Sequence, residues 1–200
     1  MKNLRRKGKF KRPAEIRGKF NDKGGSIKKR PKEVYKTKEL GHWEAYTVKS
    51  GRLDHKRKSN YCFVTLAERK SRYYIVILVE NRKSENVTPA IINALKDFPK
   101  ELVKTITFDR GKEFSEYEKI ETELKCKIYF CDPYCSWQKG TNENSNGLLR
   151  KFYPKGMDLS EVSKDDLNYK LELMNNRPRK CIKYKTPKKN LLVPYSRCCT

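Results

Sequence analysis

The stretch VKTITFDRG, at residues 103–111, decides the fold that the sequence predicts. Its Val, Ile, Phe and Thr residues are typical of a buried strand, which stops at Asp109 beside Gly111. In open α/β sheets ligands bind at the carboxyl ends of strands, and an aspartate there can hold a divalent metal. Taken alone, Asp109 is better explained as an ordinary turn residue.

The elements around this stretch complete an α/β pattern. Three preceding strands, rich in Val, Ile, Tyr and Thr, are predicted at residues 42–50, 61–70 and 73–80. Another short strand is predicted at 127–132, and helices at 84–99, 114–125, 141–153 and 163–175, the first with Ser84 as its expected cap. Hairpin-linked strands followed by alternating helices and strands predict a mixed five-stranded sheet with helices on its faces.

Charge divides the chain into three parts. Residues 1–40 are dense in Lys and Arg, which indicates a disordered tail or an arm along DNA phosphates. Residues 41–160 hold the predicted sheet, and residues 161–200 a C-terminal helix and basic tail. The formal net charge of +24 favours a polyanionic partner, above all nucleic acid. No apolar run approaches the roughly 20 residues that span a membrane, and no secretory signal is recognised.

Cysteines and histidines point to no further site. The seven cysteines are odd in number and lack framework spacing, so we expect reduced thiols in a cytosolic protein. Cys131 and Cys135 are four residues apart, but His42 and His55 lie far from them, which disfavours a zinc site. Histidine side chains titrate near neutral pH, so both are expected to do so. No residue near either one in the sequence supports a role as general base.

The helix predicted at 141–153 has two unlike faces, at about 100° per residue. Its apolar face carries Leu148, Leu149 and Phe152, and its polar face carries Glu143, Asn146 and Arg150. Solvation alone is enough to explain the polar face. The alternative is that this face presents an acid and an arginine to DNA. Phosphoryl transfer on DNA is a reaction in which Glu143 and Asp109 would act together. It uses two metal ions, which are held by carboxylates, usually three, from different elements. The third is expected from the first strand.

Many segments in order resemble the insertion sequence 30 family of DDE transposases, from about Leu4 to Pro187. They include LRRKGK, SIKKRPKEV, GHWE, ERKSRYY, FDRGKEF, SWQKGTNENSNGLLR and NNRPRK. The resemblance implies a ribonuclease-H-like fold, a Mg²⁺ or Mn²⁺ cofactor, and strand cleavage followed by strand transfer to target DNA. It also implies that Asp109 is the second catalytic and metal-binding aspartate and that Glu143 is the glutamate.

The family's first aspartate is replaced in this chain. Its pattern W-E-x-D falls on Trp43 to Tyr46, so Tyr46 occupies the aspartate position. A phenol with a pKa near 10 is a poor ligand for a hard cation at neutral pH. Glu44 lies roughly 6–7 Å further along the strand, and Asp54 lies in the following loop, so neither is expected to replace it. The family's N-terminal helix-turn-helix and C-terminal tail are also not recognised, which indicates a shortened copy.

Two hypotheses follow from the resemblance: an active transposase with an incomplete or rescued site, or a DNA-binding remnant without catalysis, which we favour. A basic RNA-binding or ribosome-associated protein explains the charge but not the ordered motifs. The expected partner is double-stranded DNA, in a bacterial nucleoid-associated protein whose active relatives form homo-oligomers. Phosphate contacts are predicted at Arg110, Lys112, Lys139, Arg150 and Lys151, with solvated charge as the alternative. Trp43 and Trp137 are predicted to pack in the interior rather than stack on bases.

Overall fold

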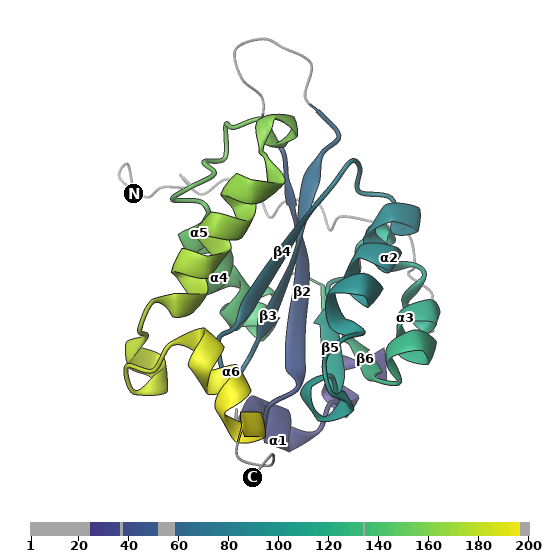
Figure 1. Ribbon diagram of the computed structural model, residues 1–200. Helices are drawn as coiled ribbons and strands as arrows, with labels where there is room; N and C mark the ends of the chain where they lie inside the picture. The colour runs from purple at the N-terminus through teal and green to yellow at the C-terminus, as the bar shows by residue number, and fades with distance from the viewer. Residues whose placement is uncertain (1–24, 37, 52–58, 134, 197–200) are drawn as a thin grey trace, which may run out of the picture.

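Six strands form a mixed sheet in this computed structural model, which describes residues 25–36, 38–51, 59–133 and 135–196. The strands are β1 (Gly25–Ser26), β2 (His42–Lys49), β3 (Cys62–Glu68), β4 (Tyr74–Val79), β5 (Thr105–Phe108) and β6 (Lys127–Phe130). Their order across the sheet is β1-β6-β5-β2-β3-β4 (Figure 1). Strand β2 therefore lies between β5 and β3, in the middle of the sheet.

The pairing directions agree with the predicted ribonuclease-H-like arrangement. β2, β3 and β4 pair antiparallel, while β5 and β6 run parallel to β2. The predicted mixed α/β fold is thus confirmed. The sheet has one strand more than the predicted five, because β1 pairs parallel with β6. Its two residues follow a Lys-rich stretch and carry no alternating pattern, so backbone pairing alone defines them as a strand.

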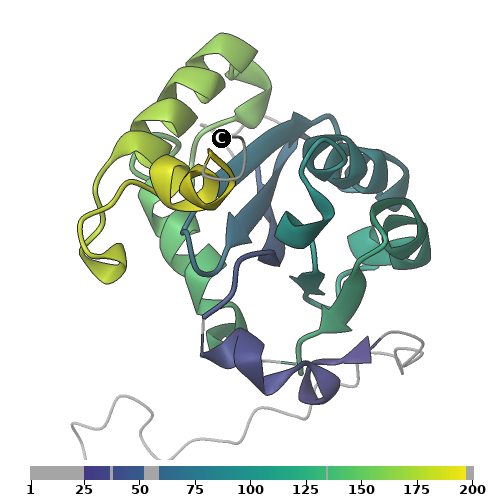
Figure 2. The ribbon, with the colours of Figure 1, turned by 60° about the horizontal axis from the view of Figure 1, so that its bottom comes forward.

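Helices lie on both faces of the sheet (Figures 1 and 2). α2 (Ser84–Leu95) and α3 (Tyr117–Leu124) cover one face, and α4 (Gly140–Leu149) and α5 (Lys164–Asn176) cover the other. The short α1 (Lys32–Tyr35) and α6 (Pro187–Ser196) lie at the lower end of the sheet in Figure 1. Within the part of the chain that the structure describes, no helix is long and apolar enough to cross a bilayer.

Two apolar cores hold these layers together. The core under α2 and α3 contains Trp43, Ile91, Phe108 and Ile120, and the core under α4 and α5 contains Phe63, Tyr74, Leu149, Tyr153 and Met174. Trp43 is fully buried and donates from Nε1 to Leu102 O at 2.7 Å, as expected for a packing residue. Burying this apolar area supplies the main driving force for the fold.

Three local predictions are wrong. The N-cap of α2 is Lys83 rather than Ser84, whose hydroxyl instead donates to Glu116. Phe152 lies beyond α4 and is exposed, and the first half of the buried α4 face is polar, with Thr141, Asn142 and Ser145. Helix α6 lies in the segment predicted only as a basic tail, and Thr186 Oγ1 accepts from Lys189 N at 3.2 Å at its start. A threonine cap before a proline is a helix-start signal that the sequence prediction missed.

Asn175, at the end of α5, replaces a missing strand partner of β4. Its Nδ2 donates to Tyr74 O at 2.8 Å, and its Oδ1 accepts from Tyr74 N at 2.9 Å. Since β4 is the last strand of the sheet, this amide satisfies backbone groups that an edge strand leaves without a partner. The NNRPRK segment, which includes Asn175, therefore has a structural role.

Asn175→Ala should lower the free energy of unfolding by about 2–4 kcal/mol, because it leaves a buried N–H and a buried C=O unsatisfied. Urea denaturation measures the change. The neighbouring Asn176 is exposed and bonds only weakly to Glu172 at 3.3 Å, so Asn176→Ala should change stability by less than about 0.5 kcal/mol. Equal losses for the two variants would contradict the role given to the Asn175 amide.

Candidate active site

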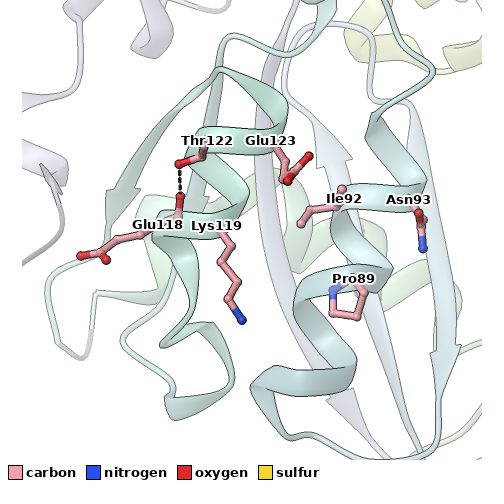
Figure 3. Close-up of a pocket in the computed structure, with 7 residues that line it drawn as sticks. All are labelled: Pro89, Ile92, Asn93, Glu118, Lys119, Thr122 and Glu123. Carbon is pink, nitrogen blue, oxygen red and sulfur yellow. Dashed lines mark hydrogen bonds between the residues drawn. The ribbon is translucent and has the colours of Figure 1, made fainter.

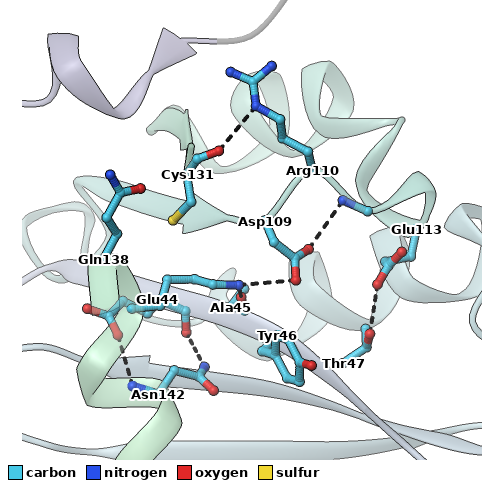
Figure 4. Close-up of polar contacts among 12 residues, drawn as sticks. Glu44, Ala45, Tyr46, Thr47, Asp109, Arg110, Glu113, Cys131, Gln138 and Asn142 are labelled. Atoms are coloured by element: carbon cyan, nitrogen blue, oxygen red, sulfur yellow. Dashed lines mark hydrogen bonds and ion pairs between the residues drawn. The ribbon is translucent and has the colours of Figure 1, made fainter. Parts of the chain in front are cut away.

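Tyr46 and Asp109 lie close together on two neighbouring parallel strands (Figure 4). β2 pairs with β5 so that Glu44 is opposite Thr107, and two residues further along each chain Tyr46 comes level with Asp109. Because side chains alternate along strands, both point to the face that α4 covers. The structure therefore brings together the strand-end aspartate and the tyrosine at the position where the resemblance implies an aspartate.

A lysine ammonium lies between these two side chains. Lys139 Nζ is 3.3 Å from Asp109 Oδ2, donates to Ala45 O at 3.2 Å, and lies 4.8 Å from the centre of the Tyr46 ring. Lys139 is buried, whereas the Asp109 side chain is 34% exposed, so water still screens this ion pair in part. A positive charge supplied by the chain itself thus already neutralises this carboxylate.

The Tyr46 phenol adds no negative charge. Partial burial, and to a lesser degree the nearby Asp109 carboxylate, raises the pKa of Tyr46 above its ordinary value. The hydroxyl therefore stays protonated at neutral pH. Its ring offers a π-face to the Lys139 ammonium, which is a favourable cation–π geometry.

Glu44 is fully buried and its carboxylate is already engaged. It forms an ion pair with Arg69, and its Oε2 accepts the backbone N–H of Asn142 at 2.9 Å. Asn142 Nδ2 also donates to Glu44 O at 2.7 Å (Figure 4). These bonds hold the first turn of α4 against β2 and occupy the carboxylate. Asp54, the other acid considered as a substitute, lies outside the described residues.

Glu143 projects from this first turn of α4 and is exposed. Its neighbour Asn142 is tied to Glu44, so α4 starts beside the strand that carries Tyr46. In the described ranges, no group of three or more His, Cys, Asp or Glu side chains is arranged to hold a metal ion. Glu143 thus lies on the helix turn that packs against β2, and Asp109 follows the neighbouring strand β5.

Glu113 is a buried acid near the site that sequence reasoning missed. It accepts from Arg82 Nε at 2.8 Å and Arg82 Nη2 at 2.7 Å, and from Thr47 Oγ1 at 2.7 Å. Burial alone would raise the pKa of Glu113, but these hydrogen bonds outweigh it and hold the pKa below its ordinary value. A Cβ on Gly111 would lie 2.2 Å from the Glu113 carboxylate. The glycine after Asp109 therefore lets the turn close over this ion pair.

The five predicted phosphate-binding residues differ in their surroundings. Lys112 and Lys151 are exposed. Arg110 Nε donates to Cys131 O at 3.1 Å, and Arg150 Nη2 donates to Lys49 O at 3.3 Å. With Lys139 buried against Asp109, three of the five already bond within the protein. Lys112 and Lys151 are the ones that present their charge wholly to solvent.

The remaining candidates from the sequence lie in different settings. His42 is buried, and its Nδ1 is 2.9 Å from Thr105 Oγ1. Burial lowers the pKa of His42 to about 4, so the expectation that it titrates near neutral pH is wrong. Trp137 was expected to pack in the interior but is 72% exposed. Cys131 and Cys135 are free thiols, and His55 lies outside the described residues.

An open pocket between α2 and α3 contains none of the predicted site residues (Figure 3). It is lined by Pro89, Ile92, Asn93, Glu118, Lys119, Thr122 and Glu123. These side chains lie on the helices that cover the other face of the sheet from α4. The predicted site residues that the structure describes therefore lie outside this pocket.

Residues 36–136 match the family model described as the integrase core domain. This segment contains Tyr46 and Asp109 and ends shortly before Glu143. It covers β2 to β6 together with α2 and α3, which make up the sheet of the site and the layer over one of its faces.

Curated relatives extend the similarity over most of the chain. Transposase InsI for insertion sequence element IS30A of Escherichia coli is 38% identical over 173 residues, which are 86% of this chain and 43% of that protein. A probable transposase for insertion-like sequence element IS1161 of Streptococcus salivarius is 37% identical over 185 residues, 89% of this chain and 51% of the relative. The resemblance seen in the sequence is confirmed, and the chain spans about half the length of these relatives.

Glu113→Ala should lower the free energy of unfolding by about 2–4 kcal/mol, since it leaves Arg82 and Thr47 without their buried acceptor. The folded-state pKa of Glu113 is depressed, so its contribution is present above the ordinary glutamate pKa and is lost as the pH falls below it. Stability curves should therefore converge for the two proteins in acid. Glu116→Ala, at an acid paired with Lys119 on the surface, is the matched control and should have little effect.

Proposed function

Since the chain belongs to the integrase core domain family, we propose that it is the catalytic part of an insertion sequence 30-type transposase that binds DNA without strand transfer. The observation that carries the proposal is the pair formed by Tyr46 and Lys139. Tyr46 stands where the first acid is expected, and the ammonium of Lys139 contacts the remaining strand-end acid.

Integrases and transposases of this family generally use a divalent metal, and the residues present here do not fit one. A hard cation needs several oxygen ligands, carboxylates above all. Tyr46 offers a protonated phenol, Glu44 is engaged by Arg69 and Asn142, and Asp109 faces an ammonium. We propose Asp109 and Glu143 as the surviving metal ligands of the ancestral site, and Mg²⁺ or Mn²⁺ as its ion.

DNA binding is the function that this chain retains in our proposal. With 48 Lys and Arg against 24 Asp and Glu, the chain attracts a polyanion, and each phosphate contact releases a counterion. Lys112 and Lys151 are exposed near the ends of the segments that carry Asp109 and Glu143, which makes them our leading phosphate contacts. Double-stranded DNA is the proposed partner, in the bacterial cytoplasm at the nucleoid, and the complete transposases are proposed to act as homo-oligomers.

Tyr46→Asp should improve divalent-metal binding, because it restores a carboxylate level with Asp109 and removes the ring that stabilises the Lys139 ammonium. Titration with Mn²⁺, followed by the electron paramagnetic resonance signal of the free ion, measures the binding directly. Tyr46→Phe keeps the ring and adds no ligand, so it should behave as the parent chain does. Indistinguishable titrations for the Asp variant and the parent would contradict the geometry assigned to position 46.

The parent chain should give no detectable strand transfer with Mg²⁺ or Mn²⁺ and a matched element end. The physical reason is the missing ligand, since two ions must stabilise the attacking and the leaving oxygen together. Joining of labelled DNA, resolved on a denaturing gel, is the measurement. Metal-dependent joining that disappears in Glu143→Ala would show an active enzyme and overturn the proposal.

A further inference from the structure

Trp137 is the most exposed of the large apolar side chains that the structure describes, at 72%. It lies in the 3-10 turn Ser136–Lys139, directly before α4. Indole buries the largest apolar area of any side chain, so leaving it in water forgoes a large stabilisation. An exposed tryptophan beside the candidate active site therefore calls for a ligand that covers it.

Neighbouring side chains hold this turn in place. Gln138 donates from Nε2 to Asp132 Oδ2 at 3.1 Å, and its Oε1 accepts from Asp132 N at 2.8 Å. The next residue, Lys139, is buried and bonded to Asp109 and Ala45. Both residues after Trp137 are thus anchored to the site, while the indole points to solvent. Because the turn that carries the indole is already held, a planar ligand that stacks on the ring has chiefly the side-chain rotation left to restrict.

We infer that the Trp137 indole is a stacking platform for an unpaired base of DNA at the edge of the site. The inference rests on the proposed DNA-binding function and names the form of DNA that it recognises. Bases inside a duplex are stacked on both faces, whereas an unpaired base offers a free π-face to an aromatic ring. Such stacking tolerates every base, so it adds affinity for opened or single-stranded DNA without reading sequence.

Charge favours a nucleic acid over a second copy of the chain as the occupant. Each copy carries a formal net charge of +24, so two copies repel each other, and a polyanion is attracted to the same surface. Aromatic side chains combined with cationic ones are the usual means by which proteins hold single strands. Trp137 lies two residues from Lys139 and six from Glu143, within the segment that carries the site's charged groups.

Tryptophan fluorescence tests the inference directly. The chain has two tryptophans, and Trp43 is fully buried with its Nε1 bonded to Leu102. Quenching by a stacked base therefore reports on Trp137. The probes are a blunt duplex of mixed sequence and the same duplex with a short single-stranded tail. We expect the tailed duplex to quench the fluorescence and the blunt duplex to leave it nearly unchanged.

Affinity measurements with variants separate stacking from phosphate contact. Trp137→Ala should bind the tailed duplex roughly 5- to 100-fold more weakly and the blunt duplex equally well. Its slope of log Kd against log salt should stay that of the parent, because no phosphate contact is lost. Lys151→Ala, the matched control, should weaken both duplexes and reduce that slope by about 1. Trp137→Phe should retain most of the preference for the tail.

The outcomes also distinguish this inference from the proposed function. Absence of binding to either duplex at low salt would overturn the proposed DNA-binding function itself. Equal binding of both duplexes by the parent and Trp137→Ala, with no quenching, would overturn the stacking inference alone. A parent that sediments as a dimer and a Trp137→Ala variant that sediments as a monomer would overturn it in favour of a second copy.

Discussion

The buried carboxylate of Glu44 is the constraint on which the site depends. An isolated charge in the middle of a sheet would be strongly unfavourable, so Glu44 requires both the guanidinium of Arg69 and the backbone N–H of Asn142. The second of these bonds holds the first turn of α4 against β2. The side chain of Asn142 adds a second bond, from Nδ2 to Glu44 O, which accounts for a polar residue at this point of the inner face of α4. An apolar residue at 142 would keep the backbone donor of the Glu44 carboxylate and lose this side-chain bond.

The arrangement of the backbone elements around the site, its frame, is therefore independent of the chemistry of residue 46. The frame consists of a parallel pair of strands, which brings position 46 level with Asp109, and of the Glu44–Asn142 bonds, which add α4. Neither depends on what residue 46 is. The chemistry does depend on it, since a carboxylate at position 46 would offer a metal ligand, whereas the protonated phenol of Tyr46 offers a ring that favours an ammonium. The similarity to transposases over most of the chain therefore applies to the frame of the site. Whether the chain is active has to be measured.

Features with a strong local pattern were predictable from the sequence, and features that depend on a distant partner were not. The strands β2 to β5 and the helices α2 and α5 have the expected periodicity, and Asp109 follows its strand as predicted. Strand β1 could not be predicted, because two residues have no period and gain their structure only from β6. Glu113 was missed for a similar reason: as one acid in a basic loop it has no sequence signal, and its role depends on Arg82, which lies 31 positions away. Trp137 is exposed, although the sequence predicted that it packs in the interior. Its neighbour Gln138 bonds to the polar side chain of Asp132, so the turn is held by polar contacts rather than by burial of the indole.

The replacement that we propose at position 46 would also have a consequence for stability. Carboxylates that converge on a metal site repel one another when no ion neutralises them, and this repulsion raises the free energy of the metal-free fold. In this chain one carboxylate is absent and Asp109 is paired with Lys139, so the strand end is neutralised by the chain's own charges. The fold then needs no ion to offset repulsion at this edge. Active sites commonly sacrifice stability for function, and a copy released from selection for catalysis can move in the opposite direction. Under our proposal the Tyr46–Lys139 pair is a local change of that kind, because no carboxylate at position 46 adds to the charge of Asp109 and the Glu44 frame stays intact.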